Sequence, residues 1–261
     1  MPVILNEVKQ VEYIIEKGEV GNKPTSTLFL LGKYYRQKKD LDKEQTFNKL
    51  NEFMQQHYKN YNSALWEDII ENIAKKANKY SLREINSIDI TQSELNEIAK
   101  IDNLKYQKLL FTMLCYAKLY NLISENNHSW INTDIKEVFR VARVTVKYRN
   151  DKFIYLNDLE KSGLISFSNK NDNLNIQVNF TDMSDGYVLR IDDFRELGYE
   201  YLNYVKKERF IRCAECKRLV KKKNKYDYSK KYCTECSKKI ESHNALARKR
   251  KQRNMENVTK A

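Results

Sequence analysis

Apolar side chains recur every three or four residues through the first third of the chain, with charged and polar side chains between them. This period is typical of amphipathic helices, and we expect four of them. The first lies within residues 5–17, Pro24 opens the second, and the second ends at the Lys38-Lys39-Asp40 break. Asp42 is the expected N-cap of the third helix, and Ile70 lies within the fourth.

The middle of the chain combines a helical pattern with an alternating one. Three helices are expected, at residues 103–120, 134–142 and 147–162, with Thr133 as the cap of the second. Gly163 is suited to the left-handed position that ends the last of them. The apolar period then changes to two, which predicts a β-hairpin, a further strand and a closing helix, at residues 164–167 with 174–180, 187–191 and 193–206.

These patterns predict a mainly α protein with a small β-hairpin wing, of the α+β class. We expect a helical N-terminal domain at 1–90, a winged-helix-like domain at 91–206 and a zinc module with a basic tail at 207–261. The stretch YLNDLEKSGLISFS resembles the end of the recognition helix and the entry to the wing in many bacterial winged-helix regulators. This resemblance implies a helix that enters the major groove and presents Lys147, Arg149 and Lys152. A winged helix that contacts only protein is the alternative.

Residues 24–79 carry a second resemblance, which rests on the spacing of their apolar residues. They resemble the small helical module at the C-termini of some plasmid and phage primases. No cluster of metal-binding carboxylates accompanies the module, so the resemblance implies a setting in DNA replication without catalysis.

The positive charge of the chain is concentrated at its C-terminal end. Residues 206–261 contain 20 Lys and Arg against 6 Asp and Glu, a net charge of +14, whereas the whole chain carries +13. A concentrated basic segment attracts polyanions because each phosphate that it neutralises releases counterions. A solubilising tail is the other interpretation.

Four of the five cysteines form two pairs, and each pair is separated by two residues. Cys213 and Cys216 are followed, after sixteen residues, by Cys233 and Cys236. This spacing is that of a four-cysteine Zn²⁺ site, in which two knuckles supply a tetrahedral set of thiolates. A thioredoxin-like motif, a disulfide scaffold and an iron–sulfur cluster fit the pattern less well. Cys115 stands apart in an apolar helix and is expected to be buried.

The residues between and after the cysteine pairs are basic, with tyrosines among them. A helix is expected after the second pair, so the module resembles a treble-clef finger. The tyrosines 226, 228 and 232 either stack on bases or pack the small core of the module. The candidate nucleic-acid contacts of this region are Lys221, Lys222, Lys223, Lys225, Lys230, Lys231, Arg248, Lys249, Arg250, Lys251 and Arg253.

Treble-clef scaffolds also occur in His-Asn-His nucleases, so the pair His243-Asn244 is relevant. Those enzymes need a general-base histidine and a second metal, and the three histidines of this chain supply no matching partner. We therefore expect a protein that is not an enzyme, with a nuclease as the alternative, and we expect His243 to be exposed. His57 is expected at the surface or at a helix end.

The whole arrangement resembles zinc-finger proteins encoded by phages and mobile elements of low-GC Gram-positive bacteria. The resemblance implies a non-catalytic DNA-binding protein in the cytoplasm of a bacterial host, which acts in transcription regulation or in replication initiation. DNA is the expected partner in preference to RNA. The alternative is a protein-interaction factor that engages a host or phage protein, such as a nucleic-acid machine or a defence complex. No membrane association is expected, because no apolar run approaches the length of a membrane span.

Overall fold

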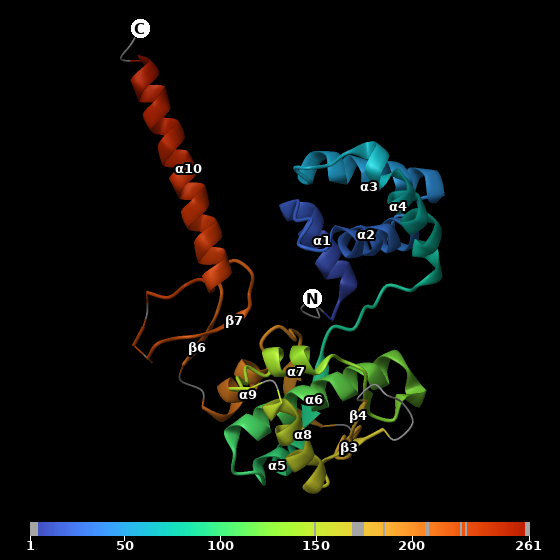
Figure 1. Ribbon diagram of the computed structural model, residues 1–261, viewed down its shortest axis with the longest axis vertical. Coiled ribbons are helices and arrows are strands. Elements are labelled where there is room, and N and C mark those ends of the chain that lie inside the picture. The colour runs from blue at the N-terminus through green and yellow to red at the C-terminus, as the bar shows by residue number, and fades with distance from the viewer. Residues whose placement is uncertain are drawn as a thin grey trace. The chain divides into compact units, whose positions relative to one another are not determined.

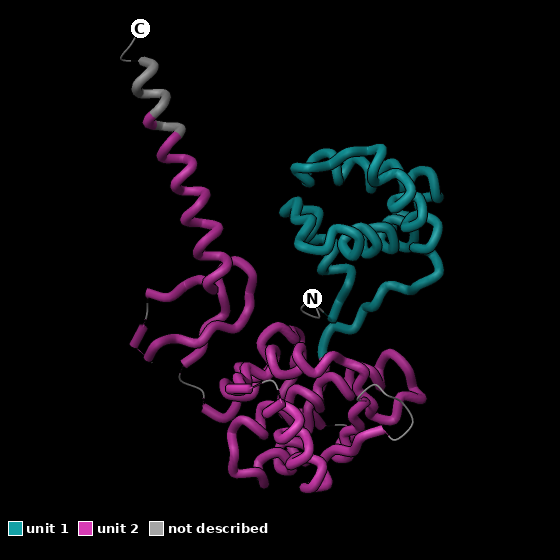
Figure 2. Tube along the Cα trace, viewed as in Figure 1, with its two compact units in different colours: residues 1–87 teal, residues 88–261 magenta. Residues whose placement is uncertain are grey.

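The computed structural model describes residues 5–148, 150–168, 175–184, 186–206, 209–224, 226–227 and 229–258. The chain divides into two compact units, residues 1–87 and 88–261 (Figure 2). The fold is mainly α-helical with small antiparallel sheets of two or three strands, which confirms the predicted class (Figure 1). The segments predicted as the middle domain and as the zinc module both lie in the second unit.

Four helices pack together in the first unit, as the apolar spacing predicts. They are α1 (Glu7–Lys17), α2 (Pro24–Lys38), α3 (Lys43–His57) and α4 (Ser63–Lys76), followed by the short 3-10 helix η1 (Ala77–Lys79). Leu28 and Leu31 of α2 are fully buried in the core of this unit. Asp42 caps α3 as predicted, because its carboxylate accepts a hydrogen bond from the backbone N–H of Gln45 at 2.8 Å.

The second unit begins with a two-stranded sheet that joins distant parts of the chain. Strand β1 (Ile88–Thr91) pairs antiparallel with β5 (Tyr187–Ile191). The sequence pattern predicts β5 but not its partner, because β1 is short and passes directly into α5 (Gln92–Ala99). The Thr91 hydroxyl caps α5 by accepting from the backbone N–H of Glu94, and the Glu94 carboxylate accepts from the backbone N–H of Thr91. This capping box ends the strand and starts the helix at one residue.

The centre of this unit is built around α6 (Leu104–Ile123). Eleven consecutive residues of α6, from Leu109 to Leu119, are buried, and Cys115 is among them, as predicted. The remaining elements follow in the order η2 (Glu125–Asn127), β2 (Trp130–Ile131), α7 (Ile135–Val141), α8 (Asp151–Lys161), β3 (Ile165–Phe167) and β4 (Ile176–Val178). The strands form a sheet in the order β2-β4-β3, so β2 adds to the predicted hairpin a strand that the sequence pattern did not reveal.

Three predicted helix starts are wrong by a few residues, each for a local reason. Asp134, not Thr133, caps α7, because the Thr133 hydroxyl is bonded to Tyr120 instead. Helix α8 begins at Asp151 and not at 147, because the residues before it form a turn in which the Asp151 carboxylate accepts a hydrogen bond from the backbone N–H of Tyr148. Helix α9 (Leu197–Val205) starts later than 193, because Asp193 forms a turn by accepting from the backbone N–H of Arg195.

The close packing of α9 on the end of α7 depends on one glycine. A Cβ atom at Gly198 would lie 1.9 Å from the carbonyl oxygen of Ala142. At the end of α8, Gly163 has a φ of 77°, which is the left-handed conformation predicted for it. Glycine is therefore required for close approach at the first position and for backbone conformation at the second.

Candidate metal centre

The first cysteine pair lies in the turn of a small β-hairpin. Strands β6 (Phe210–Arg212) and β7 (Leu219–Lys221) pair antiparallel, and Cys213 and Cys216 lie in the connection between them. The backbone N–H of Cys213 donates to the carbonyl of Arg218 at 2.9 Å, and that of Lys217 donates to the carbonyl of Cys213 at 3.0 Å. Lys217 has a φ of 60°. This tight, partly left-handed turn directs both sulfur atoms to the same side.

The second pair lies at the start of α10 (Thr234–Val258), the helix predicted after it. Cys233 immediately precedes the helix, and Cys236 occupies its first turn. The backbone N–H of Ser237 donates to the carbonyl of Cys233 at 2.9 Å, so the helical turn holds the two cysteines one above the other. The backbone N–H of Ala214 donates to the carbonyl of Lys231 at 3.0 Å, which brings the segment before Cys233 against the first knuckle.

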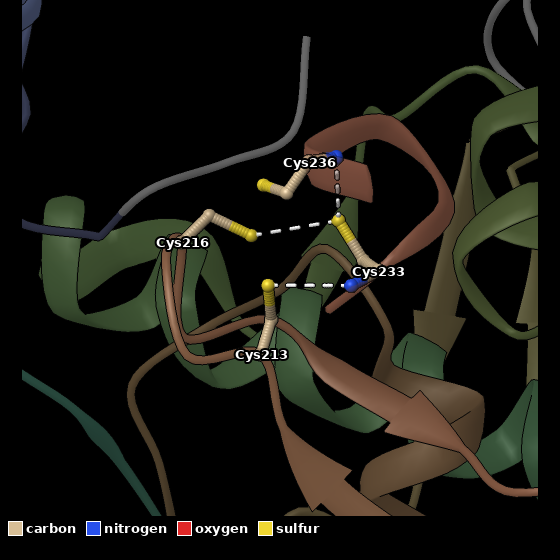
Figure 3. Close-up of side chains that lie close together, drawn as sticks. All are labelled: Cys213, Cys216, Cys233 and Cys236. Atoms are coloured by element: carbon tan, nitrogen blue, oxygen red, sulfur yellow. Dashed lines mark hydrogen bonds between the residues drawn. The ribbon is translucent and has the colours of Figure 1, made fainter. Parts of the chain in front are cut away.

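The four sulfur atoms converge on one point, as Figure 3 shows. All of them lie within 4.8 Å of one another, and the sulfurs of Cys216 and Cys233 are 3.8 Å apart. Four sulfurs placed about 2.3 Å from a central Zn²⁺ at tetrahedral angles would be about 3.8 Å apart. The cluster therefore has the ligand type, the number and the spacing of a site that could hold a metal ion.

Burial and backbone hydrogen bonds act in opposite directions on these thiols. Burial raises the pKa of Cys213, but hydrogen bonds from the backbone of Cys216, Cys233 and Glu215 outweigh it and lower the pKa to about 6. Burial is the main cause that raises the pKa of Cys216 and of Cys236. Backbone N–H groups reach two sulfurs, from Cys233 to Cys213 at 3.3 Å and from Cys236 to Cys233 at 3.4 Å. A cation at the centre would favour the thiolate form at every position.

The cysteines themselves form most of the core of the module. Cys213, Cys233 and Cys236 are buried with Val220, and Tyr232 is among the few partly buried residues packed against them. Tyr232 thus fits the predicted packing role, whereas Tyr226 is 67% exposed. So small an apolar core needs a cross-link or a metal ion to be stable, because it buries too little surface to offset the entropy of ordering the chain.

A set of arginines ties the hairpin to the rest of the second unit. Arg195 donates to the carbonyl oxygen of Cys216 at 2.7 Å while it is paired with Asp193. Arg218 lies between Glu196, at 3.8 Å, and Glu235 of α10, at 3.1 Å.

A further ion pair links the cysteine hairpin to α9. Arg212 of β6 is bonded to both carboxylate oxygens of Glu200, at 2.6 and 3.1 Å. Glu196, which Arg218 approaches, also accepts two hydrogen bonds from Arg143, at the end of α7. The cluster of cysteines is therefore connected by ionic contacts to α9 and, through Glu196, to the segment that leads into α8.

The sequence pattern did not single out these contacts. Arg195, Glu196 and Glu200 lie in a stretch of alternating charges that resembles any solvated helix surface. The burial of Glu196 and Glu200 is the signal that distinguishes them, and only the packed chain reveals it.

The predicted nucleic-acid contacts of the tail differ in how they are placed. Lys221, Lys223, Lys231, Arg248 and Lys249 are exposed, and Lys222 and Lys230 are half-buried. Lys225 lies outside the described residues, and so do the side chains of Arg250, Lys251 and Arg253. Every residue of α10 from Glu241 to Lys249 is exposed, including His243, as predicted. This part of α10 is therefore free to contact a partner along its whole circumference.

Helix α8 presents a different surface from the one predicted. Lys147 is exposed, but Lys152 is half-buried with its ammonium 5.4 Å from the centre of the Phe139 ring, and Arg149 lies outside the described residues. Phe153 and Ile154 are 48% and 57% exposed. The described surface around the start of α8 is therefore as much apolar as basic.

Comparisons with known proteins identified no relative of this chain. No protein-family model, curated protein or solved structure matches the chain. Among the described residues, no helix has both the length and the apolar character that crossing a lipid bilayer requires.

Proposed function

We propose that this chain is a zinc-containing, non-catalytic DNA-binding protein. Cys213, Cys216, Cys233 and Cys236 would hold one Zn²⁺, whose chemistry is structural: it neutralises four thiolates and cross-links the hairpin to α10. The observation that carries the proposal is the direct continuation of this cluster into α10, a helix of basic sequence whose residues from Glu241 to Lys249 are all exposed.

The distribution of charge supports a polyanion as the partner. The segment 206–261 carries a net charge of +14, and ionic contacts with Glu196 and Glu200 hold its cysteine hairpin in place. Because the cysteine hairpin is held in place, the basic helix α10 is anchored at one end, which reduces the entropy lost when it binds a phosphate backbone. In this proposal the tail supplies most of the affinity.

The order of α6, β2, α7, α8, β3 and β4, with β2 paired to β4, supports a winged-helix role for the middle of the second unit. In such a role α8 would enter the major groove and position the tail on a site. A regulator of transcription or a replication-initiation factor of a phage or mobile element would use this division of labour.

Fluorescence anisotropy with a random 30-base-pair duplex tests the proposal on the full-length, zinc-loaded protein. Because each lost phosphate contact lowers the slope of log K against log salt by about 0.9, Arg248→Gln with Lys249→Gln should flatten the slope by about two units. The matched control, Lys75→Gln with Lys76→Gln in α4, removes the same charge and should leave the slope unchanged. Absence of binding at low salt, or equal slopes for the two double variants, would exclude DNA binding by the tail.

The apolar surface around the start of α8 favours a second candidate, a protein-interaction factor. Tyr148, Phe153 and Ile154 are each about half exposed or more, and such side chains anchor protein interfaces. In this case Phe153→Gln should abolish capture of a phage or host protein and leave the affinity for DNA unchanged. Loss of DNA affinity in Phe153→Gln, with folding retained, would instead assign α8 to the groove.

A further inference from the structure

A cavity of about 660 Å³ lies where the cysteine hairpin meets α6 and α9. Its walls come from the start of α6, from the end of α9 with Lys206 and Arg209 beyond it, and from the β6–β7 hairpin. The lining residues are Leu104, Leu202, Val205, Lys206, Arg209, Phe210 and Lys221. The volume is in the range of small-molecule sites in proteins.

Within the described part of the chain, the charged residues that line the cavity are all positive. Lys206, Arg209 and Lys221 contribute three cations, and no acidic residue of the described chain lines the cavity. No ion pair involves these three side chains among the described residues, unlike the arginines that tie the hairpin to α9. Cations that share a cavity repel one another, so an anion bound between them is stabilised.

Lys108 of α6 experiences the same excess of positive charge. Burial lowers the pKa of its ammonium, and the nearby charges of Lys221 and Lys105 lower it further. The ammonium of Lys108 is held in place because it donates to the carbonyl of Arg143 at 2.7 Å. The start of α6 adds the positive end of a helix dipole on the same side, where Leu104 lines the cavity.

The rest of the lining is apolar and includes one aromatic ring. Phe210 and Lys221 are directly opposite each other across the β6–β7 pair, so their side chains lie on the same face of the hairpin. The ring of Phe210 is supported by Tyr199, whose centroid is 5.5 Å away. Leu202 and Val205 of α9 complete an apolar wall, and Val205 is 47% exposed although it is apolar.

We infer that this cavity binds a nucleotide, with the phosphate between Lys206, Arg209 and Lys221 and the base against Phe210. An aromatic ring beside a group of cations matches the two parts of a nucleotide, its planar base and its charged phosphate. The inference goes beyond the proposed function, which uses the exposed basic surface of the tail and the surface of α8 but not this cavity. The nucleotide could be free in solution or part of a single strand, and the chemistry at the cavity is the same.

Isothermal titration of the full-length, zinc-loaded protein tests this site with deoxyadenosine 5′-monophosphate, with deoxyadenosine and with an eight-residue single strand. The monophosphate should bind with a stoichiometry of one, and deoxyadenosine, which lacks the phosphate, should bind at least tenfold more weakly. If Arg209→Gln weakens binding of the single strand as much as binding of the monophosphate, the natural ligand is a strand. If it weakens binding of the monophosphate alone, the ligand is a free nucleotide.

Arg209→Gln and Lys221→Gln should each lower the affinity for the monophosphate at least tenfold. The control Lys136→Gln removes one positive charge from the exposed surface of α7 in the same unit and should change the affinity less than twofold. Zinc content and circular dichroism establish that each variant is folded. Equal binding of deoxyadenosine and its monophosphate, or equal effects of Arg209→Gln and Lys136→Gln, would overturn the inference. Duplex binding that persists in Arg209→Gln keeps the proposed function separate from this result.

Discussion

The guanidinium of Arg195 donates a hydrogen bond to the carbonyl oxygen of Cys216 at 2.7 Å, across the contact between the cysteine hairpin and the residues before α9. Arg195 is itself fixed by Asp193, whose two carboxylate oxygens share the single Nε–H of the guanidinium and which accepts a further hydrogen bond from its Nη2. A cysteine knuckle is thus positioned by a side chain from outside the metal module. The four-cysteine cluster and α9 should therefore be coupled in stability.

Arg195→Ala should lower the free energy of unfolding of the zinc-loaded protein by about 1–3 kcal/mol. The substitution leaves the Asp193 carboxylate and the Cys216 carbonyl without their partner in a mostly buried position. Urea denaturation measures the loss. The control Arg190→Ala removes a more exposed arginine, paired with Asp89 on the β1–β5 sheet, and should cost less than 1 kcal/mol. Equal losses of stability in the two variants would contradict the proposed role of Arg195 in holding the cysteine hairpin.

The purified protein should contain one zinc ion per chain, and Cys233→Ser should remove it. Three thiolates and a hydroxyl bind Zn²⁺ more weakly than four thiolates, and the hairpin then loses its cross-link to α10. Elemental analysis after extensive dialysis measures the metal. Cys115→Ser is the matched control, because Cys115 is buried in α6 outside the cluster, and the variant should retain its zinc. Retention of zinc in Cys233→Ser would exclude the four-cysteine site.

Leu159→Ala should destabilise the second unit by roughly 2–5 kcal/mol. Leu159 is 2% exposed on the inner face of α8, so the smaller side chain leaves a cavity. Phe153→Ala on the outer face of the same helix removes a larger side chain that is half exposed, and its cost should be well below that of Leu159→Ala. Thermal unfolding compares the two variants. A larger loss for Phe153→Ala would show that α8 packs on its opposite face.

The stability of the second unit should fall as the pH rises toward 7 because of Glu200. Burial raises the pKa of this carboxyl from 4.5 to about 7, in opposition to its partner Arg212. Between these values the folded chain retains a proton that the unfolded chain releases. This contribution is therefore complete below about pH 4.5 and is lost as the pH rises through 7, with a total of up to about 3 kcal/mol.

Urea denaturation between pH 5.5 and 8 measures this effect as the difference between the unmodified protein and Glu200→Gln. The glutamine has no proton to lose, so the unmodified protein should lose stability relative to the variant across this range. The titration of the four cysteine thiols is common to both proteins, so their pH dependence cancels in the difference. A difference that stays constant with pH would show that Glu200 is ionised throughout.

Local sequence signals determined most of the helices and all four members of the cysteine cluster. Asp42 caps α3 and Gly163 ends α8 as predicted, because capping and left-handed backbone depend on side chains within a few residues. Cys213 and Cys236 were identified for a similar reason: two residues between thiols bring both sulfurs to one ion in a tight turn or a helical turn.

Only the tertiary structure decided what surrounds these elements. Strand β1 exists because Ile88 pairs with Ile191, about a hundred residues later, and no local pattern encodes that partner. In the sequence, Arg195 and Lys221 are both basic residues in charged stretches, and nothing local distinguishes their roles. In the folded chain, Arg195 donates a hydrogen bond to the carbonyl oxygen of Cys216, whereas Lys221 lines a cavity. The period of apolar residues determines which face of a helix or strand is buried. Which charged residues meet where two such elements pack together depends on the tertiary structure.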